Sequence, residues 1–374
     1  MEKNTEIGDL MLIVGSYAEK TEPGIYLCRF DSSRCSIQIL QHMDGNENPS
    51  YLFAPKNSNL IYAVSENKKN DDGSLSVYSL SANTLQKVGG VSYLGAGSCY
   101  ISVGRNIRHA FIANYLSGSL SVLPLDNGLP TAAVQTLKFE GKGVDAERQD
   151  SPHIHSAVLS ADETTLYCTD LGTDQVYVFR YDADAEIPLI AENPPYITLP
   201  FGNGPRHIAC SENGNWLYVL CELTGALFAF LQRGSLAPSF QELSVNDKGF
   251  NGKIEAADLQ IHPSGHYLYA SNRGDANQII VFKIDQHNGH LAKIQSVYAQ
   301  GKSPRNLLIS PDGRFLLVAN ENSDSITTFE ISPSTGKLTF TGKSVVLKKP
   351  TCLKFLVHEC ETTSIALTAI AELN

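Results

Sequence analysis

One pattern of hydrophobic and polar positions recurs along most of the chain: a short apolar strand, a polar turn, and a second apolar strand that ends in a polar residue. About ten residues after each copy comes a stretch in which apolar and polar residues alternate, such as GSLSVYSL or DQVYVFRY. Alternation with a period of two predicts half-buried β-strands rather than helices. The six clearest copies are YLFAPKNSNLIYAVSEN (51–67), YISVGRNIRHAFIANY (100–115), HSAVLSADETTLYCTDLG (155–172), HIACSENGNWLYVLCEL (207–223), LQIHPSGHYLYASNRG (259–274) and LLISPDGRFLLVANEN (307–322).

The copies are spaced almost evenly. Between equivalent positions of the second strand the steps are 49, 56, 51, 51 and 48 residues, counted over Tyr62, Phe111, Tyr167, Tyr218, Tyr269 and Leu317. Ile13 lies 49 residues before Tyr62 and marks a seventh copy. Seven units of about 50 residues predict an all-β fold, a seven-bladed β-propeller with four-stranded antiparallel blades. We expect residues 1–374 to form this single domain.

The two ends of the repeat predict how the ring closes. The N-terminal copy has its second and third strands, MLIVGSY and GIYLCRF, but nothing before them that could be a first strand. The segment KPTCLKFL (349–356) is typical of a first strand and has no blade of its own. Pairing the two would complete a blade and remove the exposed edges of an open sheet. The segment SIALTAI (364–370) has no place in this scheme.

Composition narrows the class of protein. Hydrophobic residues make up 42% and charged residues 18%, as in an ordinary globular protein with a large core. The formal net charge of −10 argues against a general binder of nucleic acids or anionic membranes, which needs a basic surface. No segment approaches the roughly 20 apolar residues that span a bilayer. We therefore expect no nucleic acid and no membrane as partners, and a monomer or weak homodimer.

The cysteines and the N-terminus indicate a compartment. The eight cysteines are scattered, with no C-x-x-C and no spacing typical of a metal site. Several fall within strand patterns, where a free cysteine packs as a small core residue. The N-terminal apolar run, Leu10 to Val14, is too short for a signal peptide and no basic region precedes it. These features predict a reduced, cytoplasmic protein.

Charged side chains and histidines are predicted to gather at one mouth of the propeller channel. In an antiparallel hairpin, the start of the first strand and the end of the second lie at the same end. Charges brought together in a partly enclosed mouth cost desolvation energy unless they pair or bind a ligand. His262 and His266 fall on a turn at the opposite face. The residues that the repeat places at the mouth are His153, His155, Arg206, His207, Arg273 and Arg305, with Glu66, Glu222 and Glu321.

Simpler structural roles compete with a binding role for each of these residues. Glu222 could pair with Arg206 or Arg273 only to tie blades together, and His207 could be a core histidine bonded to backbone. His153 and His155 could face one side of a strand and bind a metal, but no third ligand stands at a suitable spacing. We therefore expect no metal and no cofactor. Polar residues just before the mouth are typical of strand-end caps: Asn114, Asp170, Asn272 and Asn320.

Four short motifs carry a family resemblance. S-P-H-x-H (151–155), G-P-R-H (204–207), S-N-R-G (271–274) and S-P-R-N (303–306) together resemble the seven-bladed propeller lactonases. This is the family of bacterial propeller-type 6-phosphogluconolactonases and fungal carboxymuconate lactonising enzymes, and the resemblance runs from about residue 11 to 356. One departure is the turn SENG after His207, where the family usually has H-P-D-G. The family's site residues, carried over to the matching positions, are His153 or His155, Arg206, Glu222 and Arg273.

The resemblance implies hydrolysis of a sugar-acid lactone, most directly 6-phosphogluconolactone to 6-phosphogluconate in the pentose phosphate pathway of glucose metabolism. Opening a lactone needs an activated water and stabilisation of the carbonyl oxygen as it becomes an oxyanion. We expect His155 or Glu222 to be the general base and Arg206 to clamp the oxyanion or carboxylate. Arg273 and Arg305 would anchor a phosphate through bidentate guanidinium contacts. The remaining substrate-binding candidates are His207, Glu66, Asn272 and Glu321.

Two other functions remain open from the sequence. An enzyme of the same fold could run lactonisation or open another aldonolactone, and a non-catalytic propeller could serve as a binding platform. A covalent acyl-enzyme is not expected, because no G-x-S-x-G nucleophile motif is present. No G-x-G-x-x-G or P-loop motif points to a nucleotide either.

Overall fold

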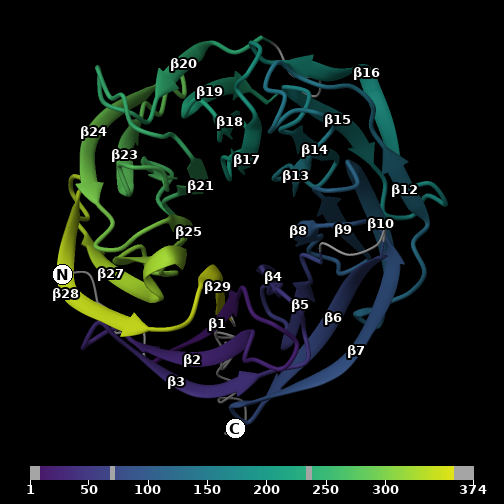
Figure 1. Cartoon of the computed structure of the whole chain (residues 1–374), viewed down its shortest axis with the longest axis horizontal. Helices are drawn as coiled ribbons and strands as arrows, with labels where there is room; N and C mark the ends of the chain where they lie inside the picture. Colours follow the sequence, from purple (N-terminus) through teal and green to yellow (C-terminus); the bar gives the residue numbers. More distant parts are fainter. Residues whose placement is uncertain (1–8, 68–71, 233–237, 358–374) are drawn as a thin grey trace, which may run out of the picture.

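The computed structural model describes residues 9–67, 72–232 and 238–357, and in these ranges the chain forms seven antiparallel sheets around a central axis (Figure 1). The only helical element in these ranges is the 3-10 turn η1 (Glu321–Ser323), and no helix there is long and apolar enough to cross a membrane. The predicted all-β, seven-bladed propeller is confirmed. The assignment of residues 1–374 to one domain stays a prediction.

From the axis outward, each blade is a sheet in which consecutive strands pair. The first three blades are β29 (Pro350–Leu356), β1 (Leu10–Ser16), β2 (Ile25–Asp31), β3 (Ser36–Met43); β4 (Tyr51–Phe53), β5 (Leu60–Val64), β6 (Asp72–Ser81), β7 (Thr84–Leu94); and β8 (Ser98–Val103), β9 (His109–Asn114), β10 (Ser119–Asp126), with β11 (Leu129–Pro130) and β12 (Gln135–Lys138) both on the outer edge of β10.

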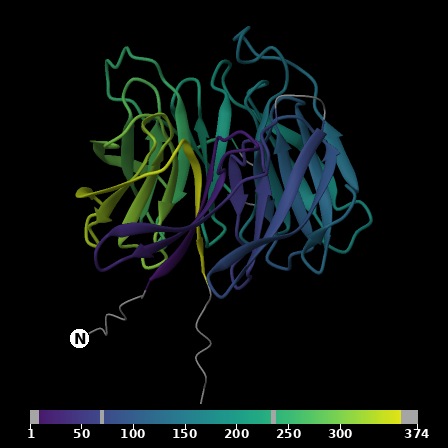
Figure 2. The ribbon, with the colours of Figure 1, turned by 60° about the horizontal axis from the view of Figure 1, so that its bottom comes forward.

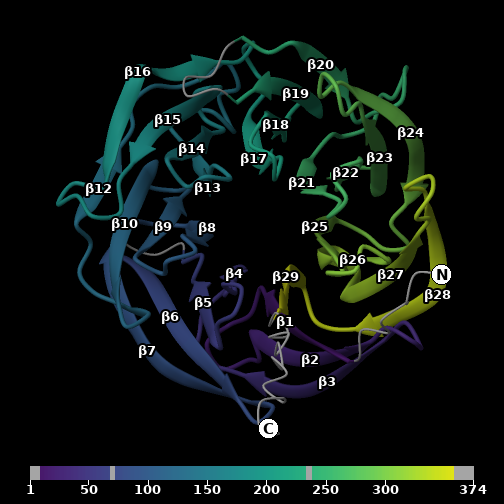
Figure 3. The same cartoon turned by 180° about the vertical axis from the view of Figure 1, so that it is seen from behind.

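The other four blades each have four strands in chain order. They are β13 (Ile154–Leu159), β14 (Thr165–Asp170), β15 (Gln175–Tyr181), β16 (Leu189–Thr198); β17 (Pro205–Cys210), β18 (Trp216–Cys221), β19 (Ala226–Leu231), β20 (Gln241–Ser244); β21 (Ala256–Ile261), β22 (Tyr267–Asn272), β23 (Gln278–Ile284), β24 (Leu291–Tyr298); and β25 (Pro304–Ile309), β26 (Phe315–Asn320), β27 (Ser325–Ile331), β28 (Leu338–Val346). Seen from either face, the innermost strands β4, β8, β13, β17, β21, β25 and β29 surround the axis (Figures 1 and 3).

The ring closes as the sequence predicts. β29, from the C-terminal side, pairs antiparallel with β1, and Val14 lies opposite Leu353. The first blade therefore combines the last described strand with the first three, which leaves no open edge between the ends of the repeat. The segment 364–370, which had no place in the sequence scheme, lies outside the described residues.

Buried tyrosines link neighbouring blades. Tyr62, Tyr218 and Tyr269 occupy the equivalent position of the second strand, and each is buried. Their hydroxyls donate to carbonyl oxygens in an outer turn of the next blade, at 2.8 Å, 2.9 Å and 2.8 Å, namely to Gly128, Gly289 and Gly336. Each tyrosine thus buries a large apolar ring and still satisfies its hydroxyl, as a buried polar group requires.

Glutamine side chains link the outer strands in a second way. The side-chain amide of Gln241 in β20 donates to the carbonyl of Leu291 and accepts from the same residue's N–H, at 2.9 Å and 2.8 Å. Three further pairs repeat this arrangement between outer strands: Gln41 with Leu85, Gln135 with Leu189, and Gln295 with Leu338. Two hydrogen bonds per pair hold adjacent blades at a fixed distance, so the inner strand ends face one another in a defined geometry.

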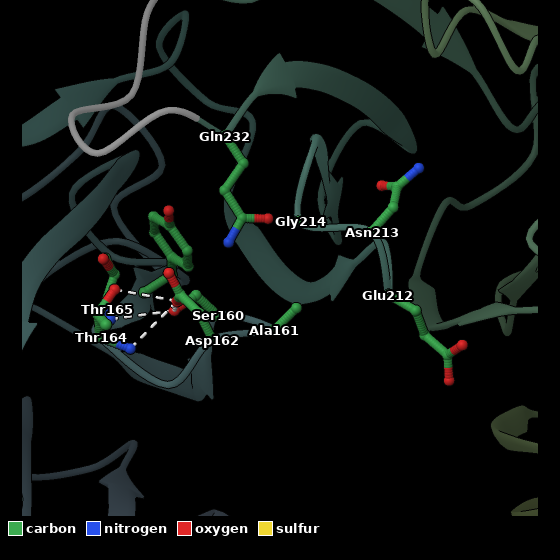
Figure 4. A pocket seen from close by; sticks show the side chains of 10 residues that line it. Ser160, Ala161, Asp162, Thr164, Thr165, Glu212, Asn213, Gly214 and Gln232 are labelled. Atoms are coloured by element: carbon green, nitrogen blue, oxygen red, sulfur yellow. Dashed lines mark hydrogen bonds between the residues drawn. The ribbon is translucent and has the colours of Figure 1, made fainter.

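The turns between first and second strands lie at the far face, because they close the inner hairpins at the end opposite to the predicted mouth. Figure 2 shows the ring tilted, with its thickness separating the two faces. In the turn of the fourth blade, the Asp162 carboxylate accepts from the hydroxyls of Ser160 and Thr164, at 2.6 Å and 3.0 Å (Figure 4). Glu163 has a φ of 57° there, where the equivalent turn of the fifth blade has Gly214 at 68°. A hollow of about 420 Å³ lies between these two turns (Figure 4). Most of the residues that line it belong to the turns themselves, so the hollow results from the repeated turn geometry.

Candidate functional site

The opposite face holds a cavity of about 270 Å³ where the ends of the inner hairpins meet. Its wall side chains come from blade positions that lie far apart in sequence but at the same mouth, as antiparallel connectivity predicts. The position just after the second strand contributes from five blades. The residues that line the cavity are Tyr17, Glu66, Cys99, Tyr115, Arg148, His155, Glu222, Glu255, Arg273 and Arg305.

Glu222 binds three arginines at once. Its Oε2 accepts from Arg206 Nε and from Arg273 Nη2, each at 2.8 Å, and its Oε1 accepts from Arg148 Nη2. Arg206 is almost wholly buried and also donates to the carbonyl of Ala257 in the next blade. The pairs of Glu222 with Arg206 and with Arg273, which the sequence left as alternatives, are therefore both present in one cluster.

Charge balance in this cluster controls the protonation of Glu222. Burial alone would raise the pKa of its carboxyl, but the charges of Arg273, Arg206 and Arg148 together hold that pKa well below its usual range. Burial and the nearby Arg273 charge lower the pKa of Arg206 to about 10, so both partners remain ionised at neutral pH. Both oxygens of the Glu222 carboxylate already accept hydrogen bonds from guanidinium groups, which makes Glu222 less suited than His155 to be a general base.

His207 lies beneath the cavity in a chain of hydrogen bonds. Its Nδ1 is 2.8 Å from Asp258 Oδ1, and its Nε2 is 3.1 Å from an Arg206 guanidinium nitrogen. Because arginine can only donate, His207 Nε2 accepts and Nδ1 carries the proton to Asp258. Burial and the Arg206 charge lower the pKa of His207 to about 4, which agrees with this neutral form.

Both ring nitrogens of His207 are thus occupied, and the residue does not line the cavity. Asp258 is itself buried and accepts further hydrogen bonds from Asn306 Nδ2 at 2.6 Å and from the N–H of Leu307 at 2.8 Å. The rings of Tyr51 and Tyr100 stack at 4.3 Å, and both lie edge-on to the His207 ring. His207 therefore braces Arg206 from below, rather than contacting a ligand from the cavity wall as the sequence suggested.

The two histidines of S-P-H-x-H differ in their surroundings. The ring nitrogens of His153 face the Tyr115 carbonyl at 2.9 Å and the Asp150 carboxylate at 3.2 Å, and the ring stacks on Tyr115. His155 lines the cavity, and among the described residues its buried Nδ1 has no hydrogen-bond partner. Burial and the charge of Arg206 hold the pKa of His155 well below 6.5, so its imidazole is neutral at neutral pH.

A second charged group, around Arg305, also lines the cavity. Arg305 lies 3.8 Å from Glu66 Oε2 and 3.5 Å from Glu321 Oε2. Its Nη2 donates to the Tyr17 hydroxyl at 2.6 Å, and that hydroxyl donates to Glu66 at 2.8 Å. The structure therefore brings Arg305, Glu66 and Glu321 together, as the repeat alignment predicts, but with Arg305 already paired to two carboxylates.

The Asn272 side chain caps backbone N–H groups. Its Oδ1 accepts from the N–H groups of Glu255 and Gly274, and its Nδ2 donates to Asn246. It does not line the cavity, so these contacts agree with the strand-end-cap interpretation rather than with the substrate-binding assignment. Asp170 is a similar cap, bonded to the N–H groups of His153 and Gly172.

Sequence reasoning missed several members of the cavity wall. Arg148 lies in the loop between β12 and β13, outside the repeated phrase, and is held there by Gln149, whose side chain donates to the Leu171 carbonyl. Tyr17 stands four residues after Ile13, just as Glu222 stands four after Tyr218, so extending the repeat to the seventh copy would have found it. In the described ranges, no group of three or more His, Cys, Asp or Glu side chains is arranged to hold a metal ion.

Known proteins resemble this chain in sequence and in fold over nearly its whole length. Residues 11–355 match the model of the family described as lactonase, 7-bladed beta-propeller. A protein of Formosa agariphila named 6-phosphogluconolactonase is 30% identical over 93% of this chain and 99% of its own length. A putative 6-phosphogluconolactonase of Bacteroides fragilis superposes with a TM-score of 0.88 at 32% identity, over 95% of this chain and 100% of that one. The Pseudomonas aeruginosa periplasmic gluconolactonase superposes with a TM-score of 0.87 at 34% identity, over 94% and 99%.

Proposed function

Because this chain belongs to the family of seven-bladed β-propeller lactonases, we propose that it opens the ring of a sugar-acid lactone in the cavity bounded by Glu222 and Arg305. Family membership makes the chain a lactone-hydrolysing enzyme, so the binding-platform alternative is no longer needed. The lactones named for relatives are 6-phosphogluconolactone and gluconolactone. Both carry the same ring ester, and we propose 6-phosphogluconolactone, with 6-phosphogluconate as product, as one substrate.

The observation that supports this proposal is the contrast among the three mouth histidines. His153 and His207 use both ring nitrogens in contacts with the protein, whereas the ring of His155 lines the cavity and makes no hydrogen bond within the described residues. Its lowered pKa keeps the imidazole unprotonated at neutral pH. An unprotonated imidazole that lacks a protein partner is the group best placed to accept a proton from water.

The reaction then follows from the groups on the wall. His155 takes a proton from a water molecule whose oxygen bonds to the lactone carbonyl carbon. Arg273 and Arg148 donate hydrogen bonds to the carbonyl oxygen as it gains negative charge, a contribution of a few kcal/mol per donor. When the ring C–O bond breaks, the His155 imidazolium returns its proton to the leaving oxygen. The products are the open-chain hydroxy acid and a neutral His155.

Two matched variants test the role of His155. His155→Gln should lower kcat for lactone hydrolysis at least about 100-fold with little change in KM, since it removes the base alone. His153→Gln, two residues away, should lower kcat far less because that ring is bonded to protein on both sides. Hydrolysis is followed in a pH-stat and corrected for the spontaneous reaction. Near-normal kcat in His155→Gln would contradict the base assignment, and no turnover by the unaltered protein would contradict the function.

Three further expectations stay predictions. The pentose phosphate pathway as the biological setting follows only from the phosphorylated substrate. A cytoplasmic location rests on the absence of disulfides among the described cysteines, and the Pseudomonas relative is called periplasmic. The monomer or weak homodimer expected from the sequence is tested by sedimentation of the purified chain.

A further inference from the structure

The two walls of the cavity carry opposite net charge. On the first wall, Arg148, Arg273 and Glu222 line the cavity. With the buried Arg206, three guanidinium groups share the single carboxylate of Glu222, which leaves an excess of two positive charges. On the second wall, Arg305 and Glu66 line the cavity, and Glu321 pairs with Arg305 from outside the lining, so two carboxylates share one guanidinium and leave an excess of one negative charge. Glu255, which also lines the cavity, pairs with Lys253 at 2.7 Å and is balanced.

This polarity orients a lactone. Negative charge develops on the carbonyl oxygen during ring opening and stays on the product carboxylate, so this end of the substrate belongs at the positive wall. The hydroxyl groups at the other end are hydrogen-bond donors, and carboxylates accept such bonds. Burial and the nearby carboxylates raise the pKa of the Tyr17 phenol well above 10, so Tyr17 adds a neutral hydroxyl there.

The same wall is unfavourable for a phosphate. A phosphate ester carries a charge of about −1.5 to −2 at neutral pH. Arg305 is the cation nearest to Glu66 and Glu321, and it is already bonded to Tyr17 and paired with both carboxylates. A phosphate at this wall would therefore face two carboxylates that Arg305 does not fully neutralise. Such repulsion is a common way to exclude a competing substrate.

Building on the proposed lactone hydrolysis, we propose that Glu66, Arg305 and Glu321 form a hydroxyl-binding subsite that makes this enzyme prefer a lactone with an uncharged far end over its phosphorylated counterpart. This reverses the expectation from the sequence that Arg305 anchors a phosphate. 6-Phosphogluconolactone remains a substrate, but gluconolactone is the better one.

Glu66→Gln and Glu321→Gln test the subsite because each removes one negative charge and keeps an oxygen acceptor. Glu330→Gln is the matched control, because Glu330 is an exposed carboxylate of the same blade. It lies near the end of β27, opposite Phe315 at the start of β26, and so at the face away from the mouth. Turnover is measured with both lactones. Binding of gluconate and of 6-phosphogluconate is measured by calorimetry, which does not depend on turnover.

The unaltered enzyme should have a kcat/KM at least about tenfold higher for gluconolactone and should bind gluconate more tightly than 6-phosphogluconate. The double variant Glu66→Gln/Glu321→Gln should reduce the kcat/KM ratio of the two lactones and the affinity ratio of the two acids, each at least about tenfold. Glu330→Gln should leave both ratios unchanged. A preference for the phosphorylated compounds, no binding of either acid, or ratios unchanged in the double variant would overturn the subsite. If the binding preference holds but neither lactone is hydrolysed, the subsite stands and the proposed function fails.

Discussion

Glu222→Gln is the substitution that best separates a catalytic carboxylate from a structural tie. The change keeps the shape of the side chain and removes the one negative charge shared by Arg148, Arg206 and Arg273. The side chains of Arg206 and Arg273 are only 3% and 10% exposed, so neither guanidinium can turn into water. Arg148 is 36% exposed and can, which relieves part of the repulsion.

The expected loss of stability follows from this burial. Removing one partner of a buried ion pair costs about 3–5 kcal/mol, because the remaining charge is left uncompensated. With two buried guanidiniums left and a third free to move, we expect about 4 kcal/mol. Since a native protein has about 5–15 kcal/mol of stability, the variant should remain folded at 25 °C. Its kcat/KM should fall at least about 100-fold, since the arginines that face the oxyanion lose their alignment.

A second substitution distinguishes the two roles. Arg273→Met in the Glu222→Gln background removes one of the two buried positive charges, so the double variant should regain about 1–3 kcal/mol relative to the sum of the single losses. Activity should not return with stability, because the positive wall has then lost two of its groups. Stability is measured by urea unfolding and activity in the pH-stat, with Glu330→Gln as the control for charge alone.

Two results would refute this reasoning. An unfolding free energy of Glu222→Gln within about 1 kcal/mol of the unaltered protein would mean that the cluster is not held by its carboxylate. Recovery of both stability and activity in the double variant would mean that Glu222 acts only as a tie between strands.

Two predictions concern pH. With His155 as base, the acid limb of kcat/KM should lie below 6.5, and Arg206→Gln should move it up toward 6.5 because the Arg206 charge helps to lower that pKa; a limb at or above 6.5 in the unaltered enzyme would contradict the assignment. His207 has a folded-state pKa of about 4 against 6.5 when unfolded, so between these values only the unfolded chain binds the proton and stability falls as pH falls. Relative to His207→Gln, the unaltered protein should therefore lose about 3 kcal/mol of unfolding free energy between pH 7 and pH 4, as measured by urea unfolding. If the unfolding free energy depended equally on pH in both proteins, the buried neutral form of His207 would be contradicted.

The repeat alignment predicted the positions of those mouth residues that strand geometry alone determines. Arg206, Glu222 and Arg305 sit at the ends of inner strands, and the antiparallel hairpin brings those ends to one mouth whatever the side chains are. The closure of β29 on β1 was predictable for the same reason, from a first strand without a blade and a blade without a first strand.

What the alignment did not predict is which polar groups pair. Arg148 comes from the loop that makes the step from Phe111 to Tyr167 the longest of the repeat, at 56 residues, so the repeat alignment assigns it no position. The pairing of His207 with Asp258 depends on two adjacent blades having a histidine and a carboxylate at facing positions of strands 51 residues apart. Sequence position shows that both face inward, but only the distance between the blades shows that they meet.

The closure of the ring also sets when the site can exist. Tyr17 follows β1, and its backbone N–H donates to the carbonyl of Lys349 at 3.1 Å, immediately before β29. Its hydroxyl joins Glu66 to Arg305, so one wall of the cavity depends on contact between segments more than 300 residues apart in the chain. Contacts between such distant segments are slow to form, because chain entropy is lost before the contacts stabilise the fold. A chain still being synthesised can therefore stack six blades and have no complete cavity. Catalysis begins only after β29 has paired with β1.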